Sequence, residues 1–247
     1  MSSASGSGPV GPLSLRPDLD RFLDRCAGLI VEAADEGRIV ACILCGSFAT
    51  GEGSIVEESD KSIFLSDVDI VAVADDLDTH RSIRVRRNEI GEACESLLPG
   101  VEFAGRVDVG VLLAGEFGEL PHSPGIHDMR KNGRVLRGPE DMLLRIPERA
   151  PSTIGADQAL RLVENRVPPL LLSHGAAGSA GGDRWRFIYA ISRVYTDIAT
   201  AALCLAGRYE SGYALRARRF AGVAESGAAW RELEKPVENW TLSLIHI

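Results

Sequence analysis

Hydrophobic and polar positions follow a helical period at the start of the chain and a strand-like pattern after it. Between Arg16 and Gly37, apolar side chains recur at helical spacing, and Gly37 is a plausible C-cap. Two short apolar runs follow, at 38–45 and 64–74, and each predicts a buried strand. This order of elements is typical of a sheet that is covered by helices.

The pattern continues with another helix and another strand. A helix is predicted from a cap at Asp78 or Thr79, and a third strand is predicted at 107–113. A short helix that stops at Gly133, a brief strand and a helix opened by Pro139 complete this part of the chain. Beyond it only helical patterns remain, and they predict helices at 156–173, 184–206 and 211–226.

The change of pattern divides the chain into two expected domains. We predict a mixed fold, α+β or α/β, in which a small mixed sheet with flanking helices at 16–150 precedes an all-helical C-terminal bundle at 151–241. Residues 1–15 are small and polar, without the apolar centre of a signal peptide, so we expect a disordered leader there. Residues 242–247, "LSLIHI", are what a common sequencing adapter encodes in this frame, so we expect them to be a non-native tail.

Composition narrows the class of protein. Hydrophobic residues make up 45% of the chain and charged residues 25%, which is ordinary for a globular protein. We see no apolar run of about 20 residues, so we expect no membrane span and a cytoplasmic location. The five cysteines argue against a disulfide framework because their number is odd. Cys42 and Cys45 form a C-x-x-C within a strand, where their side chains point to opposite faces, so we expect packing; a thiol-redox protein is the alternative.

The charge distribution disfavours one kind of substrate. The formal net charge is −8, and the acidic excess lies in the first 150 residues, whereas the rest of the chain is slightly basic. An acidic catalytic half would repel a polyanion, so a long nucleic acid is an unlikely partner. A small-molecule or protein acceptor fits this balance better.

Three aspartates are the candidate catalytic and metal-binding residues. Asp67 and Asp69 stand two apart at the head of an apolar strand, so both side chains leave the same face of the sheet. Two adjacent carboxylates repel each other unless a cation lies between them, and Mg²⁺ prefers oxygen ligands of this kind. Asp108 alternates with valines in the strand at 107–113, where it could join the first two if the strands are neighbours.

The turn at Gly46 and Ser47 is the candidate phosphate-binding segment. A glycine at the end of a strand lets the backbone approach a ligand closely, and the following turn can direct N–H groups and a hydroxyl at phosphate oxygens. A plain strand-to-helix turn with Ser47 as N-cap is the alternative. A phosphate site beside a carboxylate cluster is what a nucleoside triphosphate requires.

In order along the chain, "CGSFATGEG", "SDVDIVAV" and "RVDVGVL" resemble the nucleotidyltransferase superfamily related to DNA polymerase beta. The resemblance covers about residues 20–145. It implies that Gly46 and Ser47 hold the triphosphate, that Asp67 and Asp69 bind two Mg²⁺ ions, for which Mn²⁺ could substitute, and that Asp108 binds the catalytic ion and helps to activate the attacking hydroxyl. The 19 residues between Ser47 and Asp67 form a longer connection than compact members use; we expect a solvated acidic loop, with a role in shaping the pocket of a cationic acceptor as the alternative.

The helical half offers further candidates. Arg186 and Arg193, with Tyr189 between them, lie at spacings that could turn one polar strip toward a triphosphate, and we include both arginines as nucleotide-binding residues. Solvated helix faces are the alternative. His122 and His127 fall in a segment rich in proline and glycine, and we expect them to be loop residues and not ligands.

The predicted function is Mg²⁺-dependent transfer of a nucleoside monophosphate, with ATP as the expected donor of AMP, to a hydroxyl of a small molecule or a protein. Among members of the superfamily, aminoglycoside adenylyltransferases and antitoxins that adenylylate a toxin both suit an acidic catalytic half. The chain could act as a homodimer or with a partner protein. The alternative function is a non-catalytic nucleotide-binding or antitoxin-like module.

Overall fold

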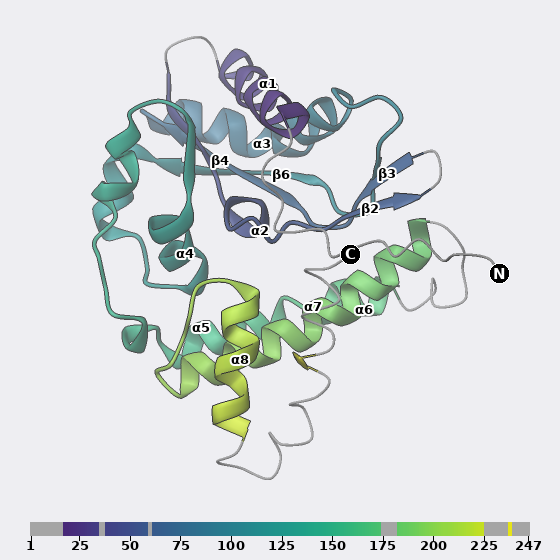
Figure 1. Ribbon diagram of the computed structural model, residues 1–247. Coiled ribbons are helices and arrows are strands. Elements are labelled where there is room, and N and C mark those ends of the chain that lie inside the picture. The colour runs from purple at the N-terminus through teal and green to yellow at the C-terminus, as the bar shows by residue number, and fades with distance from the viewer. Residues whose placement is uncertain (1–16, 35–37, 59–60, 174–181, 225–236, 239–247) are drawn as a thin grey trace, which may run out of the picture.

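The computed structural model describes residues 17–34, 38–58, 61–173, 182–224 and 237–238. Figure 1 shows a sheet with helices on one face and a helical half of the molecule below the other. This arrangement confirms the coarse prediction of a mixed fold with small mixed sheets and a helical C-terminal region. The expected leader at 1–15, the expected tail at 242–247 and the expected cap at Gly37 lie outside the described residues.

The main sheet has the strand order β6-β4-β1-β7. Strands β4 and β6 are parallel, whereas β1 pairs antiparallel with both β4 and β7, so the sheet is mixed. Its strands occupy most of the predicted segments, and the strand predicted at 107–113 is reproduced in full: β1 (Ile39–Leu44), β4 (Val68–Ala74), β6 (Val107–Leu113) and β7 (Arg134–Arg137).

Helices α1 (Pro17–Ala33) and α3 (Leu77–Glu95) cover one face of this sheet (Figure 1). Their apolar sides pack on the valines, isoleucines and alanines that alternate along β1, β4 and β6. The cap of α3 differs from the prediction: Asp76, not Asp78 or Thr79, accepts hydrogen bonds from the backbone N–H groups of those two residues. Asp76 can do so because its own backbone is still extended.

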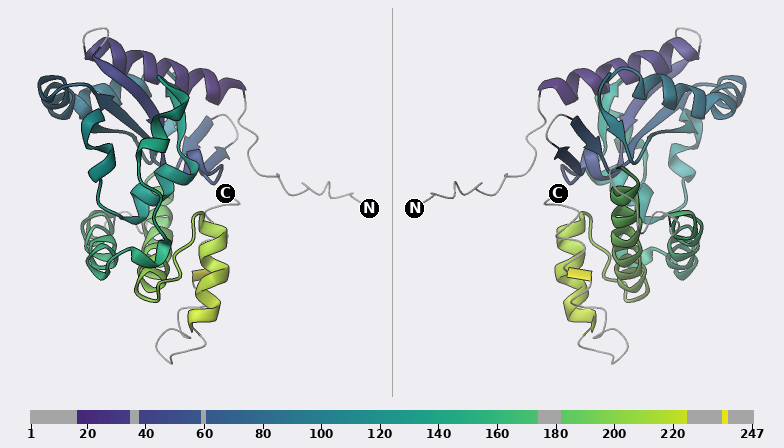
Figure 2. Two further views of the ribbon diagram at one scale, coloured as in Figure 1. Left: turned by 90° about the vertical axis from the view of Figure 1, so that its left-hand side faces the viewer. Right: turned by 90° about the vertical axis from the view of Figure 1, so that its right-hand side faces the viewer.

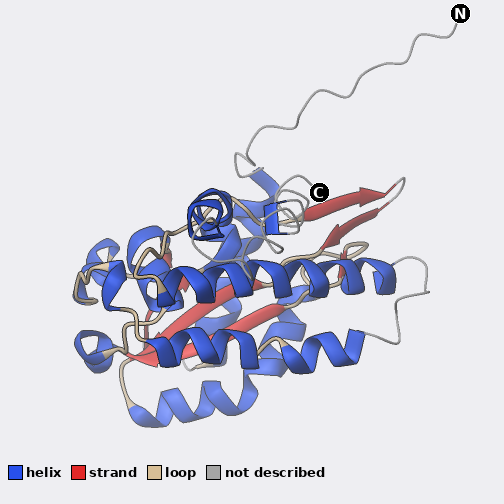
Figure 3. Ribbon diagram, turned by 90° about the horizontal axis from the view of Figure 1, so that it is seen from below, coloured by secondary structure: helices blue, strands red, loops and turns tan. Residues whose placement is uncertain are grey.

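The strand predicted at 64–74 is broken in two. Its first residue belongs to β3 (Lys61–Phe64), which pairs with β2 (Ile55–Glu58) and with the short β5 (Glu102–Phe103) in a separate sheet. The chain bends after β3 because the N–H groups of Leu65 and Ser66 both donate to the carbonyl of Ser54. The connection after Ser47 therefore contains a hairpin, which projects from the edge of the body in the view from below (Figure 3).

The other face of the main sheet carries short helices. A second apolar cluster there joins the sheet to the helix α4 and to two 3-10 turns. The helix expected after Pro139 is one of these 3-10 turns, because only six residues separate Pro139 from the extended Ile146. The elements on this face are α2 (Gly46–Ala49), η1 (Ala114–Glu119), α4 (Pro124–Asn132) and η2 (Glu140–Arg145).

The helical half contains η3 (Pro151–Thr153), α5 (Ala156–Glu164), α6 (Val167–Ser173), α7 (Gly182–Leu205) and α8 (Tyr213–Ala224). These helices lie together on one side of the sheet (Figure 2). The helix predicted at 156–173 is two helices, since Pro168 and Pro169 have no N–H to continue the ladder from α5.

Helix α7 is more apolar than we expected from the sequence. By length and composition alone, its segment Asp183–Leu205 could cross a membrane, and half of its apolar window is buried inside the protein. Core helices of soluble proteins meet the same criteria. The buried Asp197 and the ion pairs that it makes with Arg166 and Arg193 favour a core helix.

Candidate functional site

Asp69 and Asp108 lie directly opposite each other on the parallel strands β4 and β6. Their neighbours Val68 and Val107 are buried against the helices on the outer face, so alternation turns both aspartates to the inner face, toward the helical half. Asp67 immediately precedes β4, and its Oδ1 accepts a hydrogen bond of 3.1 Å from the backbone N–H of Arg106. The sheet therefore brings the three predicted carboxylates to one edge.

The environment of Asp67 and Asp69 makes the ionisation of these two carboxyl groups costly. Burial is the main cause that raises the pKa of Asp69 to about 7, and the neighbouring Asp67 adds to the rise while Arg193 opposes it. Burial also raises the pKa of Asp67, again against the attraction of Arg193. Near neutral pH, Asp69 therefore holds its proton for part of the time unless a further cation comes close.

Gly46 is packed against the Asp69 side chain. The backbone of Gly46 has a φ of +64°, and a Cβ atom at this position would lie 2.1 Å from Asp69 Oδ2. Only glycine satisfies both the conformation and the contact. The next residue, Ser47, is buried in the single turn of α2, which begins at Gly46. The predicted phosphate-binding turn and the predicted carboxylates are thus in direct contact.

A cavity of about 450 Å³ lies between this face of the sheet and the helical half. From the sheet half, Gly46, Asp69 and Gly110 line it; from the helical half, Arg193 and Arg216 do. Asp67, Ser47 and Asp108 are not among the residues that line it, although Asp67 and Asp108 adjoin Asp69.

The two arginines lie on the ring of Tyr213, with their Cζ atoms 5.1 Å (Arg193) and 4.5 Å (Arg216) from its centroid. The hydroxyl of Tyr213 accepts a hydrogen bond from Arg193. Each guanidinium also faces a carboxylate: Arg193 lies 3.8 Å from Asp197, and Arg216 lies 3.4 Å from Asp128. Among the described residues, the buried Nε of each arginine has no hydrogen-bond partner. The cavity wall therefore holds two fixed cations with unused donor capacity.

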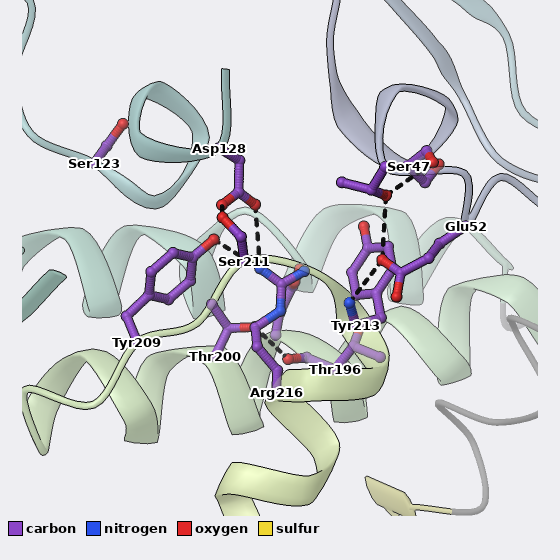
Figure 4. A network of polar contacts seen from close by, with 12 residues as sticks. Ser47, Glu52, Ser123, Asp128, Thr196, Thr200, Tyr209, Ser211, Tyr213 and Arg216 are labelled. Atoms are coloured by element: carbon purple, nitrogen blue, oxygen red, sulfur yellow. Dashed lines mark hydrogen bonds and ion pairs between the residues drawn. The ribbon is translucent and has the colours of Figure 1, made fainter. Parts of the chain in front are cut away.

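A polar network joins α4 to the segment before α8 (Figure 4). Asp128 of α4 accepts hydrogen bonds from Ser211 and Arg216, and Arg216 donates to the Tyr209 hydroxyl at 2.7 Å. This network could not be predicted from the sequence, because Arg216 is one of three arginines close together in α8 and only its burial distinguishes it from Arg218 and Arg219.

Glu52 links the loop after Ser47 to the helical half. Its carboxylate accepts hydrogen bonds from the backbone N–H groups of Tyr213 (2.7 Å) and Ala214 (3.1 Å), at the first turn of α8, and from the Thr50 hydroxyl (Figure 4). It thus satisfies N–H groups that the helix leaves unpaired. The expectation that this acidic connection is only a solvated loop is wrong at Glu52.

Two other predicted site residues, Asp108 and Arg186, do not line the cavity. Asp108 is 3.5 Å from Arg106 in an ion pair, and Arg186 is exposed, where it pairs with Asp183 and donates to the carbonyl of Phe103 at 3.2 Å. Within the part of the chain that the structure describes, no three His, Cys, Asp or Glu side chains are arranged to hold a metal ion as they stand. The donor chemistry suits Mg²⁺, since carboxylate oxygens are its preferred protein ligands, but Asp108 would have to leave Arg106 to complete the set.

Helix α3 positions the start of β6 from the outer face. The N–H of Val107, next to Asp108, donates to Glu95 Oε1 at 2.9 Å. A Cβ atom on Gly91 would lie 2.4 Å from the carbonyl oxygen of Val107, so helix and strand backbones are in contact there. The N–H of Val107 is therefore bonded to α3, and its carbonyl lies directly against this helix.

The cysteines are free thiols. Cys42 and Cys45 belong to the clusters on opposite faces of the sheet, as predicted. Burial raises the pKa of Cys42 to about 12, and burial together with Asp69 raises the pKa of Cys45. A thiol that stays protonated is a poor nucleophile, so the thiol-redox alternative gains no support.

His122 lies in a loop, as predicted, whereas the prediction is wrong for His127, which is in a helix. His122 Nε2 lies 3.3 Å from His127 Nδ1, and His127 is in α4, where its ring meets Tyr209 edge to face. They line a second cavity, on the other side of α4.

Comparison with known proteins adds little. No family model and no curated protein matches the chain. One solved structure, described as the crystal structure of a toxin-antitoxin with AMP-PNP, matches over 50% of this chain and 80% of that chain, at 19% sequence identity and a TM-score of 0.31. A TM-score this low supports no conclusion about fold or function.

Proposed function

We propose that the protein is a Mg²⁺-dependent nucleotidyltransferase that moves a nucleoside monophosphate, AMP from ATP in the first instance, to a hydroxyl group. The observation that carries the proposal is the pairing of Asp69 with Asp108 across parallel strands, with Asp67 at the same edge and Gly46 in contact with Asp69. Asp67 and Asp69 from one segment meet Asp108 from another at this edge, and burial already penalises the charge of Asp67 and Asp69.

The carboxylate chemistry of the residues present suits divalent cations, once the side chains have rearranged to complete a site. Asp67 and Asp69 would hold both ions, and Asp108 would turn from Arg106 to bind the ion nearer the acceptor. When bound, such ions lower the pKa of the attacking hydroxyl and neutralise charge on the leaving pyrophosphate. The raised pKa of Asp69 supports this assignment, because a carboxyl that is costly to ionise alone gains most from a nearby cation.

The nucleotide would occupy the cavity beside Asp69. Gly46 lets the backbone approach the phosphates, with Ser47 adjoining in α2, and Arg193 and Arg216 supply positive charge from the opposite wall. Arg216 is an addition to the sequence prediction. A role for Arg186 in nucleotide binding stays a prediction, since its guanidinium is engaged by Phe103 and Asp183.

The acceptor is proposed as a small molecule or a protein, and an assay of pyrophosphate release with Mg²⁺ and ATP across a panel of both tests the function. Asp69→Asn should lower the rate by about 1,000-fold or more, because metal binding contributes several kcal/mol to the barrier reduction. Asp75→Asn is the matched control: Asp75 is exposed just beyond the far end of β4, and this variant should keep the full rate. Equal rates for the two variants would overturn the proposal.

A second candidate is a nucleotide-binding module without transfer activity, with a protein as its partner. The ion pair between Asp108 and Arg106 favours it, since this pair competes with metal binding. Tight Mg²⁺·ATP binding without pyrophosphate release for any acceptor would support this candidate. The cytoplasmic location and the homodimer also stay predictions.

A further inference from the structure

The cavity on the far side of α4 is as large as the one beside Asp69. Its volume is about 490 Å³, and it is lined by residues of α4 and of the segment 146–151. Three cations contribute to its wall: Arg130 and Lys131 from α4, and Arg149 from the segment that leads to the helical half. Among the described residues none of these three makes an ion pair, and Glu148 is the acidic side chain on the wall.

Two of the cations are held in place by the backbone. Arg130 Nε donates to the carbonyl of Ile146 at 3.1 Å, and Arg149 donates from one terminal nitrogen to the carbonyl of Leu120 at 2.8 Å. Each guanidinium has five N–H groups, so both keep several donors for a ligand. Because these side chains are already ordered, a ligand that binds them loses less conformational entropy in the complex.

The two histidines on this wall form a chain of hydrogen bonds with Thr153, and the contacts of the Thr153 hydroxyl favour one tautomer of each ring. The Thr153 hydroxyl donates its one hydrogen to the carbonyl of Ala150, so it must accept from His122 Nδ1, which lies 2.8 Å away. In the neutral ring, His122 Nε2 is then an acceptor, and His127 Nδ1 donates to it over 3.3 Å. Nε2 of neutral His127 is left as an acceptor, and it makes no hydrogen bond with a described residue.

We propose that this cavity is a second binding site, for a small organic anion with an oxyanion head group and an apolar body. The head group binds Arg149, Lys131 and the free edge of Arg130, and the body packs on Ile126, Ile146 and Pro147. The site is independent of the proposed function, since α4 separates it from the cavity beside Asp69 and no predicted catalytic residue lines it.

His127 gives the site a pH dependence of known sign. Burial, together with nearby positive charge from Lys131, lowers the pKa of His127, while Asp128 and Glu210 oppose the shift; burial, His127 and Arg149 lower the pKa of His122. Both rings are therefore neutral at pH 7. A proton added to Nε2 of His127 leaves this chain of hydrogen bonds intact and places one more cation on the wall, so anion affinity rises as the pH falls below about 6.5.

Calorimetric titration of the whole protein with benzenesulfonate tests the site, because the charge of this anion does not change with pH. Benzenesulfonamide, its neutral analogue, should bind at least about tenfold more weakly. Arg149→Gln should weaken benzenesulfonate binding by about tenfold, and Lys131→Gln, at an exposed position with no described contact to lose on folding, by about threefold. Arg145→Gln is the matched control, since Arg145 is exposed outside the cavity, and it should bind as the wild type does.

The pH arm compares the wild type with His127→Gln. Wild-type affinity for benzenesulfonate should increase several-fold between about pH 7.5 and about pH 5.5, and His127→Gln should abolish this increase. Phenyl phosphate and benzoate, compared near pH 8, distinguish a phosphate ester from a carboxylic acid as the natural head group. If benzenesulfonate and benzenesulfonamide bind equally, or if Lys131→Gln and Arg149→Gln both bind as Arg145→Gln does, the site does not exist as proposed.

Discussion

The two cavities on either side of α4 are similar in size and opposite in chemistry. Ile126 lines both, and their volumes are about 450 and 490 Å³. In the cavity beside Asp69 the arginines are paired with carboxylates, whereas in the second cavity the cations make no ion pair with a described residue. The first arrangement suits a metal complex, which carries both signs of charge, and the second suits an anion alone. Charge pairing, and not volume, therefore distinguishes what each cavity can bind.

After Asp69→Asn, the variant Gly46→Ala is expected to have the largest effect on transfer activity, and it should affect the first cavity alone. The new Cβ would collide with Asp69 Oδ2 and displace a proposed metal ligand, so transfer activity should fall at least about 100-fold. Gly51→Ala is the control, because Gly51 has a similar φ of +75° but open space around its Cα. Both variants carry the backbone strain of about 1 kcal/mol, so a similar activity for both would show that strain, and not the contact with Asp69, is what matters.

Arg216→Met should come next, with a loss of about 3 kcal/mol in the free energy of unfolding, measured by denaturant titration. The change leaves Asp128 charged and half-buried and removes the donor to Tyr209. Arg218→Met, at an exposed position of the same helix, should change stability by less than about 0.5 kcal/mol. The variant Arg216→Met should also lose ATP affinity but keep benzenesulfonate affinity. Loss of both affinities would show that ligand binding in the two cavities is coupled.

The pH dependence of stability should have opposite signs at the two cavities. The folded state raises the pKa of Asp69 to about 7, from an ordinary value of 3.8, so between these values the unfolded state releases a proton that the folded state keeps. In metal-free protein, this term lowers stability as the pH rises from about 4 to about 7. Asp69→Asn removes the term and should be more stable than the wild type by about 2 kcal/mol near pH 8, with the partial exposure of the carboxyl allowed for. Added Mg²⁺ should narrow the gap by stabilising the wild type alone.

For His127 the folded state lowers the pKa, so the unfolded state binds the extra proton. Stability is then complete above the ordinary histidine pKa of about 6.5 and falls as the pH drops below it. Thermal unfolding of His127→Gln across the same pH range should show a smaller acid-side loss, of which the remainder comes from the lowered pKa of His122. If the stability of the wild type changes with pH in neither of these two ways, the predicted difference in charge between the two cavities is wrong.

The smallest expected effect is that of Glu52→Gln, which should lower the free energy of unfolding by about 1 kcal/mol. The change weakens the cap of α8 without removing every hydrogen-bond acceptor. Glu119→Gln, at an exposed position of η1, is the control and should be neutral. Hydrogen exchange at the N–H groups of Tyr213 and Ala214 measures the effect locally. Unchanged exchange at both would show that the cap contributes nothing.

The sequence predicted those features that local pattern determines. Strand β6 was placed in full because its valines alternate with Asp108, and Gly133 was correctly placed at the end of α4. The register that sets Asp69 opposite Asp108 is tertiary information, and a period of two cannot supply it. Arg216 was missed for a related reason, since three arginines of one helix look alike until two are found exposed.

The cap that Glu52 forms on α8 also could not be predicted from the sequence. Glu52 and Tyr213 are 161 positions apart, and nothing near either residue distinguishes Glu52 from the other acidic side chains of its loop. The split of the predicted 64–74 strand is a third case, because the bend after β3 depends on the carbonyl of Ser54, ten residues upstream of the predicted strand.

Through its contact with Val107, helix α3 on the outer face of the sheet touches the backbone next to Asp108, whose side chain is on the inner face. Gly91 and Glu95 do not line the cavity, yet both contact the backbone of Val107, the residue before Asp108. The Cβ of a larger residue at position 91 would collide with the Val107 carbonyl, so α3 or the start of β6 would have to move. The backbone next to Asp108 can therefore be perturbed from the buried face of α3, without replacing any residue that lines the cavity.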